Sequence, residues 1–240
     1  KRDIVDEFQD TDLTQLEWLR LLNPESLCVV GDDWQAIYGF RGASTEPFLK
    51  FKDFFYPCNI HFLTTNYRSL PTIINTSAIP IAKNKKNIKK KVQAFRKGES
   101  HVFKIKIGEE QSLDSFCLFV KNKIADNPDL MVLCRSNFRI DHLIKLGIPK
   151  THIMTIHASK GLEFGTVFVD LQAGWNIKVD ESPDVIEEER RILYVALSRA
   201  KDNLYIFGNE KPKKDLIEDT FFGYFRFSVR AISLPSLQHS

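Results

Sequence analysis

The strongest constraint on the fold is a short apolar run at 27–30 that leads directly into a polar stretch at 31–43. An apolar run that ends in Gly-Asp is typical of a buried parallel strand at its carboxyl end, the edge at which open α/β sheets bind ligands. This placement puts Gln35 near a bound nucleotide. The stretch also combines aromatic rings with a guanidinium, a mixture that stacks on unpaired bases: Tyr38, Phe40 and Arg41. The alternative is a turn whose rings pack into the core.

Short apolar runs alternate with stretches of helical spacing along the rest of the chain. We expect strands at 4–5, 27–30, 60–63, 101–107, 130–134, 166–171 and 203–207. We expect helices at 11–22, 48–55, 71–82, 113–124, 138–146 and 187–199, with the phenylalanines of the second helix in the core. The order strand, helix, strand from 101 to 134 is a βαβ unit and argues for a second parallel sheet. The chain is therefore predicted to have an α/β fold.

Chemically capable side chains follow two of these strands. Asp6 and Glu7 follow the first strand, and such a pair suits magnesium and water chemistry. One carboxylate can hold a hydrated Mg²⁺ while the next orients and deprotonates an attacking water. Tyr67 and Arg68 follow the third predicted strand, where the ring could stack on a purine and the guanidinium could contact phosphate oxygens.

The polar loop at 155–164 holds the densest group of such residues. Its small residues and Gly161 let backbone amides approach a phosphate, and His157 and Lys160 add hydrogen-bond donors. Arg199 lies at the end of the last predicted helix, where a guanidinium could act as an arginine finger.

The composition is that of a soluble globular protein, with 43% hydrophobic and 27% charged residues. The net charge of +3 is nearly balanced, so composition alone does not indicate a nucleic-acid-binding protein. Basic residues concentrate at 83–97, a segment without any acidic residue. A solvated surface face is the favoured interpretation of this segment, and a patch that follows phosphates is the alternative.

The cysteines and apolar runs indicate a cellular location. Of the four cysteines, Cys28 and Cys134 lie inside apolar runs and are predicted to be buried, while Cys58 and Cys117 have no partner at metal-site spacing. We expect neither disulfides nor zinc. No apolar run reaches the roughly 18 residues of a membrane span, and no charged-then-apolar leader is present, so we expect a cytoplasmic location.

Taken together and in this order, these stretches resemble the motifs of the superfamily 1 DNA helicases of the UvrD/Rep group. The sequences Asp-Asp-Trp-Gln-Ala-Ile-Tyr at 32–38 and Thr-Ile-His-Ala-Ser-Lys-Gly at 155–161 are most similar to the helicase IV branch. The resemblance covers the chain from Ile4 to about Phe207. It implies RecA-like P-loop NTPase lobes with parallel sheets, ATP in the cleft between the lobes and single-stranded DNA across their top.

The resemblance also implies roles for individual residues. Asp6 and Glu7 would hold Mg²⁺, and Glu7 would be the catalytic base. The ATP site would contain Gln35 as γ-phosphate sensor, Tyr67 stacked on adenine, Arg68 and Arg199 on the γ-phosphate, and Gly161 and Glu163 near the ribose and phosphates. The residues that meet DNA would be Tyr38, Phe40, Arg41, His157 and Ser159.

The chain departs from this family pattern in two ways. No Gly-rich loop ending in Gly-Lys-Thr or Gly-Lys-Ser occurs, so the phosphate cradle is missing. We therefore expect a fragment that begins at the Walker B motif and is inactive alone. Only a short link joins Leu146 to Thr155, where many relatives carry a large mobile subdomain, so we expect the chain to lack that subdomain.

The predicted organisation has an incomplete first lobe. Residues 1–65 would form the C-terminal half of the first motor lobe, 66–210 the second lobe and 211–240 a tail. The tail could dock a protein partner or pack back on the second lobe. The parent protein is expected to unwind DNA at junctions of single and double strands. The competing hypothesis is a non-catalytic helicase-like scaffold that recruits or remodels a protein complex.

Overall fold

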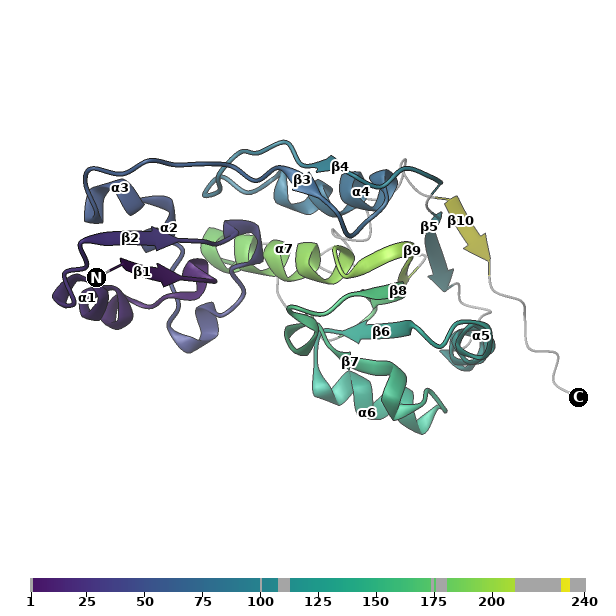
Figure 1. The fold of residues 1–240 in the computed structure, drawn as a ribbon. Helices are drawn as coiled ribbons and strands as arrows, with labels where there is room; N and C mark the ends of the chain where they lie inside the picture. The colour runs from purple at the N-terminus through teal and green to yellow at the C-terminus, as the bar shows by residue number, and fades with distance from the viewer. Residues whose placement is uncertain are drawn as a thin grey trace, which may run out of the picture.

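Six parallel strands form the larger sheet of this computed structural model, which describes residues 2–99, 101–107, 113–173, 175, 181–209 and 230–233 (Figure 1). The strand order is β10-β5-β9-β8-β6-β7. The strands are β5 (His101–Ile107), β6 (Leu130–Cys134), β7 (Ile153–Thr155), β8 (Phe164–Asp170), β9 (Ala200–Asn209) and β10 (Arg230–Ser233). The predicted second parallel sheet is confirmed, although β9 and β8 lie between β5 and β6.

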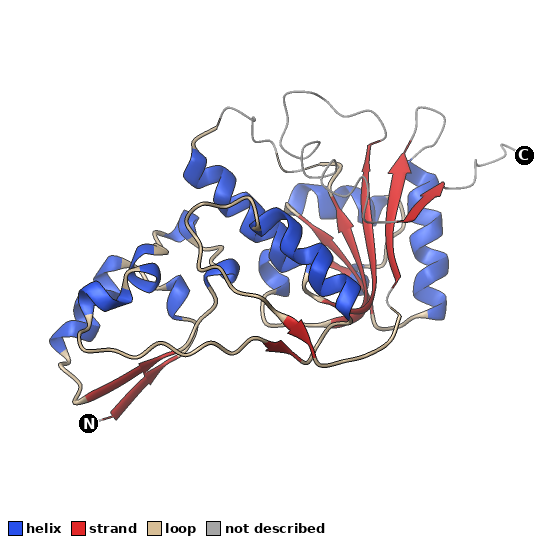
Figure 2. Cartoon of the chain, turned by 90° about the horizontal axis from the view of Figure 1, so that it is seen from above, coloured by secondary structure: helices blue, strands red, loops and turns tan. Residues whose placement is uncertain are grey.

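Helices cover both faces of this sheet (Figure 2). The helices are α4 (Pro71–Ile81), α5 (Leu113–Asp126), α6 (Asn137–Lys145) and α7 (Pro183–Leu197). Because side chains alternate along a strand, Val167 packs with α4 and α7 while the next residue, Phe168, packs with α5 and α6. The last helix begins earlier than predicted, because Pro183 fits the first turn of a helix.

A smaller part precedes this domain and contains a parallel sheet of two strands, β1 (Arg2–Val5) and β2 (Ser26–Val29). Between them, α1 (Leu13–Leu21) begins two residues later than predicted because Asp12 and Gln15 form a reciprocal capping box. The single helix predicted at 48–55 is instead two short helices, α2 (Glu46–Leu49) and α3 (Phe51–Phe54), because the backbone leaves the helical conformation at Lys50. Their phenylalanines pack against this sheet's core, as predicted. The remaining turns are the 3₁₀ helices η1 (Phe8–Asp10), η2 (Asp33–Gln35), η3 (Gly39–Arg41), η4 (Lys150–His152) and η5 (His157–Ser159).

Two other predictions for the smaller part are wrong. Cys28 is exposed, because one face of the two-stranded sheet packs on the helices and the described residues leave the other face open. Residues 60–63 form no strand, and Leu63 is 93% exposed, because this apolar run pairs with no neighbouring strand. The strand β3 (Thr65–Asn66) follows it and pairs with β4 (Gln93–Ala94).

The link from Leu146 to Thr155 is short, as expected, and carries only η4 and β7. In the tail, β10 pairs with β5 at the edge of the large sheet, while 210–229 and 234–240 lie outside the described residues. Within the described ranges, no helix has the length and apolar character to cross a membrane.

Candidate functional site

The polar stretch at 31–43 follows β2 of the smaller part. It packs against the larger part of the chain, the domain of the six-stranded sheet, rather than against the sheet of β1 and β2. Trp34 is 7% exposed and meets the ring of Tyr194 on α7 edge-on, with 5.4 Å between ring centroids. Its indole N–H donates to the carbonyl of Ile88 at 3.1 Å. Neighbouring Asp32 and Asp33 form ion pairs with Lys90, at 2.5 and 3.0 Å. These contacts hold residues 32–34 against the larger part of the chain. We call this contact region between the two parts the seam.

Gln35 and Arg199 meet at this seam. The side-chain oxygen of Gln35 accepts a hydrogen bond from Nη2 of Arg199 at 3.3 Å, and its amide donates to Asp32 at 2.7 Å. Arg199 is only 1% exposed, and its other N–H groups donate to Ser198 Oγ and to the carbonyls of Val195 and Leu162. Burial, with the nearby charge of Arg68, lowers the pKa of Arg199 to about 10. A desolvated guanidinium of this kind favours contact with an anion.

Arg68 forms the second polar pair. Its Nε donates to the Glu163 carboxylate at 2.8 Å, and this contact lowers the pKa of Glu163 below its ordinary value. Arg68 Nη1 also reaches the carbonyl of Ser198 at 3.5 Å, which places Arg68 beside Arg199. Tyr67 precedes Arg68 and is 67% exposed. The structure therefore brings Gln35, both arginines and Glu163 together.

Asp6 and Glu7 lie exposed after β1. Glu7 adopts a left-handed backbone conformation with φ of 51°, and its amide donates to the Asp6 carboxylate at 2.8 Å. Such strain at a non-glycine residue is frequent at functional sites. Two exposed carboxylates are also ligands that Mg²⁺ prefers, so the residues present fit the implied ion.

Lys160, predicted from the sequence only as a hydrogen-bond donor, links the two parts of the chain. Its ammonium is paired with the carboxylates of Asp10 and Glu7, lies 3.2 Å from the Gln35 carbonyl oxygen, and stands 5.0 Å from the centroid of the Tyr38 ring. Burial raises the pKa of Asp10 although Lys160 opposes this shift. Asp10 was missed, because nothing in the sequence distinguishes it from the acidic residues beside it.

Aromatic rings gather next to Lys160. Phe40 meets His157 edge-on at 5.2 Å between centroids, and Tyr38 lies 6.2 Å from His157. The Arg41 guanidinium lies 5.1 and 5.4 Å from the Tyr38 and Phe40 rings. Phe40 is 65% exposed, so this aromatic cluster of Tyr38, Phe40 and His157 presents a surface to solvent and is not packed into the core.

His157 donates from Nε2 to the carbonyl of Ile37, at 3.2 Å, since a carbonyl can only accept. Burial, together with the charge of Arg135, holds the pKa of His157 below its ordinary value. Ser159 differs from the other expected DNA contacts, because it is fully buried and its hydroxyl donates to the Ile156 carbonyl. This arrangement leaves the Ser159 side chain unavailable to a ligand. Gly161 is exposed, with φ of 82°, a conformation that favours glycine.

The basic segment at 83–97 is only partly a solvated face. Lys90 reaches the two aspartates of the seam, Lys86 pairs with Asp184 at 2.6 Å, and Arg96 pairs with Asp202 at 2.6 Å. Other lysines of the segment are exposed, including Lys85, Lys89 and Lys91. The segment therefore holds the two parts together as well as meeting solvent.

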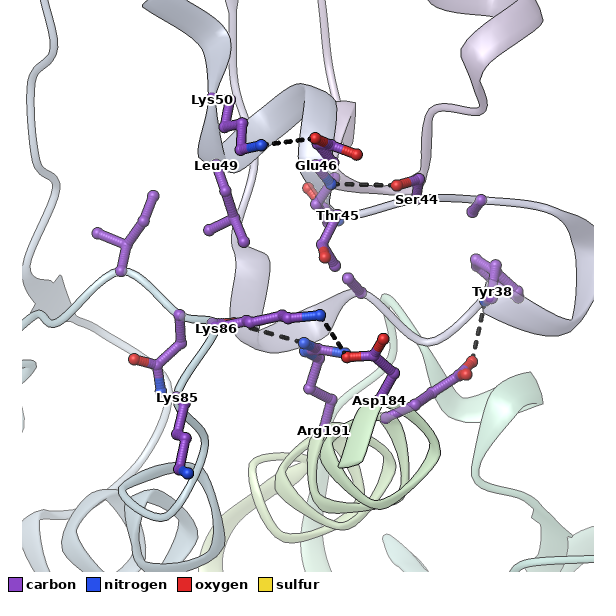
Figure 3. A pocket seen from close by; sticks show the side chains of 17 residues that line it. Tyr38, Ser44, Thr45, Glu46, Leu49, Lys50, Lys85, Lys86, Asp184 and Arg191 are labelled. Carbon is purple, nitrogen blue, oxygen red and sulfur yellow. Dashed lines mark hydrogen bonds and ion pairs between the residues drawn. The ribbon is translucent and has the colours of Figure 1, made fainter. Parts of the chain in front are cut away.

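A cavity of about 680 Å³ opens beside Tyr38, between residues 36–50, 85–88 and the first turns of α7 (Figure 3). Its lining is mixed in charge, and most of its charged side chains contact one another or the backbone, including Lys50 with Glu46, Lys86 with Asp184, and Glu188 with the amide of Gly39. Balanced charges of this kind do not favour an anion over a cation.

The doubly covered parallel sheet and the preceding parallel strands define a RecA-like α/β protein. Residues 4–56 match the UvrD/REP helicase N-terminal domain, and residues 141–211 match the UvrD-like helicase C-terminal domain. The chain therefore belongs to the UvrD/Rep-type superfamily 1 helicase family.

Relatives of this family align with most of the chain. It is 31% identical over 224 residues to a probable DNA helicase of Mycoplasma pneumoniae, covering 85% of this chain and 42% of the relative. It is 30% identical over 239 residues to DNA helicase IV of Escherichia coli, covering 88% of this chain and 34% of the relative. The chain thus spans less than half of either relative. The crystal structure of Arterivirus nonstructural protein 10, a helicase, shares the fold with a TM-score of 0.53 at 15% identity, covering 95% of this chain and 42% of that one.

Proposed function

We propose that this chain is part of an ATP-dependent DNA helicase that couples ATP hydrolysis to movement on single-stranded DNA and to opening of duplex junctions. The observation that carries the proposal is the contact of Gln35 with Arg199, beside Arg68 and Glu163. A glutamine from one part of the chain thus contacts a guanidinium group from the other part, and a second guanidinium group lies beside that one. Such a group suits the γ-phosphate of ATP, whose charge guanidinium groups stabilise during phosphoryl transfer.

The nucleotide would bind where these side chains meet. Its γ-phosphate would take over hydrogen bonds that Arg199 now makes with Gln35, and Arg68 would exchange Glu163 for a phosphate oxygen. Tyr67 would stack on the base. Glu7 would accept a proton from the attacking water. Asp6 and Glu7 would hold Mg²⁺, which would neutralise phosphate charge.

The aromatic cluster would bind unpaired bases. The exposed face of Phe40 and the ring of Tyr38 offer stacking surfaces, and Arg41 offers a charge for the backbone. Lys160 contacts Glu7, the Gln35 carbonyl and the Tyr38 ring, so a shift on the nucleotide side displaces the DNA side directly. This single side chain gives the coupling a physical route.

The first test is ATP hydrolysis by the protein extended upstream of Lys1, with and without single-stranded DNA. We expect strong stimulation by DNA, and we expect Glu7→Gln to abolish turnover because the catalytic base is lost. ATP turnover that does not depend on DNA would contradict the proposal of a DNA-driven motor. No turnover by the extended protein would favour a non-catalytic scaffold instead.

A second test addresses the DNA side. Replacing Phe40 by Ala should weaken single-stranded DNA binding by roughly 1–3 kcal/mol, the range for loss of a base-stacking ring. Phe138→Ala is a matched control, since Phe138 is 81% exposed on α6 and lies outside the aromatic cluster. Unchanged DNA affinity in Phe40→Ala would count against the assigned surface.

A further inference from the structure

Phe95 lies beside Tyr67 on the surface of the second part of the chain. Their ring centroids are 4.8 Å apart with an interplanar angle of 38°. Phe95 is 65% exposed and Tyr67 is 67% exposed, so the rings contact each other while most of both remains in water. Single exposed rings are ordinary on protein surfaces, but two adjacent rings form a joint apolar surface.

The backbone fixes this pair. In the sheet of β3 and β4, Asn66 pairs in register with Ala94, and Tyr67 and Phe95 directly follow these two residues. Figure 1 shows β3 and β4 close to α4. The Phe95 amide donates to the Asn66 carbonyl at 2.8 Å, which continues the ladder one step. Equivalent positions on paired strands project to the same face, so the rings meet because of register.

The residue after each ring anchors its strand. Arg96 Nη1 donates to the Arg68 carbonyl at 2.7 Å, and its Nη2 reaches Asp202 at 2.6 Å. Arg68 itself extends to Glu163. The ring pair is therefore held at the edge of the proposed nucleotide site, one residue from a guanidinium assigned to phosphate.

The charges near the pair indicate what kind of molecule covers it. Arg68 and Arg199 lie close enough for their like charges to oppose each other, and an anionic ligand would relieve this repulsion. A ligand with a polyphosphate and an aromatic base, that is a nucleoside triphosphate, matches the guanidinium groups at one end and the rings at the other.

We propose that Phe95 is a positioning residue that holds the Tyr67 ring so that a purine base of the bound nucleotide stacks on it. The assignment rests on the proposed function as an ATP-dependent motor. Without Phe95, the Tyr67 side chain gains rotational freedom and loses the ring that supports it. The base then stacks less firmly, whereas the phosphate contacts of Arg68 and Arg199 are unaffected.

The test is steady-state hydrolysis by the protein extended upstream of Lys1, at saturating single-stranded DNA, for the wild type and Phe95→Ala. We expect the KM for ATP to rise about 2- to 10-fold while kcat is unchanged. The preference for ATP over CTP should fall, because a purine has the larger stacking face. Inhibition by inorganic tripolyphosphate, which has no base, should be unchanged.

Two further variants separate positioning from general damage. Phe95→Tyr keeps a ring at this position, so its KM for ATP should equal that of the wild type. Phe138→Ala is the matched control, because Phe138 is 81% exposed on α6 and the structure gives it no ring contact among the described residues. An unchanged KM in Phe95→Ala would overturn the assignment. Equal weakening of tripolyphosphate inhibition, or a loss of DNA affinity with the same KM, would also overturn it.

The outcomes distinguish this inference from the function on which it rests. DNA-stimulated turnover by the wild type with no effect of Phe95→Ala would reject the role of Phe95 and leave the motor standing. An extended wild type that neither binds nor hydrolyses ATP would reject both.

Discussion

The two main sheets of the chain differ in how much of them is covered. Every residue of β6 is buried, whereas residues of β1 and β2 alternate between exposed and partly buried, and Ile4 is 78% exposed. The large sheet has helices on both faces, while the two-stranded sheet has them on one face in the described part of the chain. A strand pair covered on one side contributes little stability by itself. The smaller part therefore depends on the seam with the larger part.

Removing the tryptophan of the seam should have the largest effect. Trp34 is 7% exposed and belongs to the core of the large sheet although it follows β2 in sequence. We expect Trp34→Ala to lower the free energy of unfolding by about 3–5 kcal/mol, the cost of deleting a buried indole. Urea unfolding followed by circular dichroism measures the change.

Trp18 supplies the matched control, since it is 63% exposed on α1 in the smaller part. Trp18→Ala should change the free energy of unfolding by less than about 0.5 kcal/mol, as is usual for surface substitutions. Similar losses in the two variants would show that the buried Trp34 contributes no more than an exposed ring, and the comparison of the two sheets would fail.

The next prediction concerns the charged contact across the seam. Lys160→Met removes the partner of Asp10, whose other carboxylate oxygen is buried without a hydrogen bond. We expect a loss of about 1–3 kcal/mol in the free energy of unfolding, because a part-buried carboxylate is left uncompensated. Urea unfolding of the single variants and the double variant measures the coupling energy of the pair.

Asp10→Asn in the Lys160→Met background should recover part of this loss, because a neutral amide costs less to bury than a charge. Lys50→Met is the surface comparison, since the pair of Lys50 with Glu46 is exposed and should contribute far less. If the double variant is no more stable than Lys160→Met, the contact is not a specific link.

Whether a strand could be predicted from the sequence depended on whether helices cover one face or both faces of its sheet. Strands such as β6 and β8 were found because a sheet covered on both faces needs continuous apolar runs. The same signal failed at 60–63 and at Cys28, where an apolar run carries no information on whether another element covers it. Fold class followed from local pattern, but local pattern did not determine exposure.

The site was predictable as a set of residues and not as a set of contacts. The sequence named Gln35 and Arg199, but not that they touch, since they lie 164 positions apart. Lys160 and Asp10 are separated by 150 positions, and although the loop of Lys160 stood out in the sequence, nothing there indicated Asp10 as its partner. The burial of Ser159 depends on the packing of its own turn, which spacing does not reveal. Which polar groups pair across such long sequence separations is determined by the fold, and local sequence patterns do not reveal it.

The smallest expected effect is a pH dependence at His157, which tests whether the aromatic cluster beside the seam needs a neutral ring. Burial and the charges of Arg135 and Arg41 lower its pKa from the ordinary value of 6.5, and the Ile37 carbonyl only partly offsets them. In the unfolded chain the ring binds a proton more readily than in the folded chain. The contribution of His157 to stability is therefore complete above pH 6.5 and is lost as the pH falls through the folded-state pKa.

Urea unfolding at pH 7.5 and at a pH below 6.5 measures this contribution in the wild type and in His157→Gln. We expect the wild type to lose more free energy of unfolding between the two pH values than the variant does. Asp10 acts in the opposite direction, since its raised pKa favours the folded state as the pH falls, and the difference between the two proteins cancels that contribution. Equal losses in both proteins would mean that the ring accepts a proton in the folded state without cost, and that the aromatic cluster is open enough to water to hydrate it.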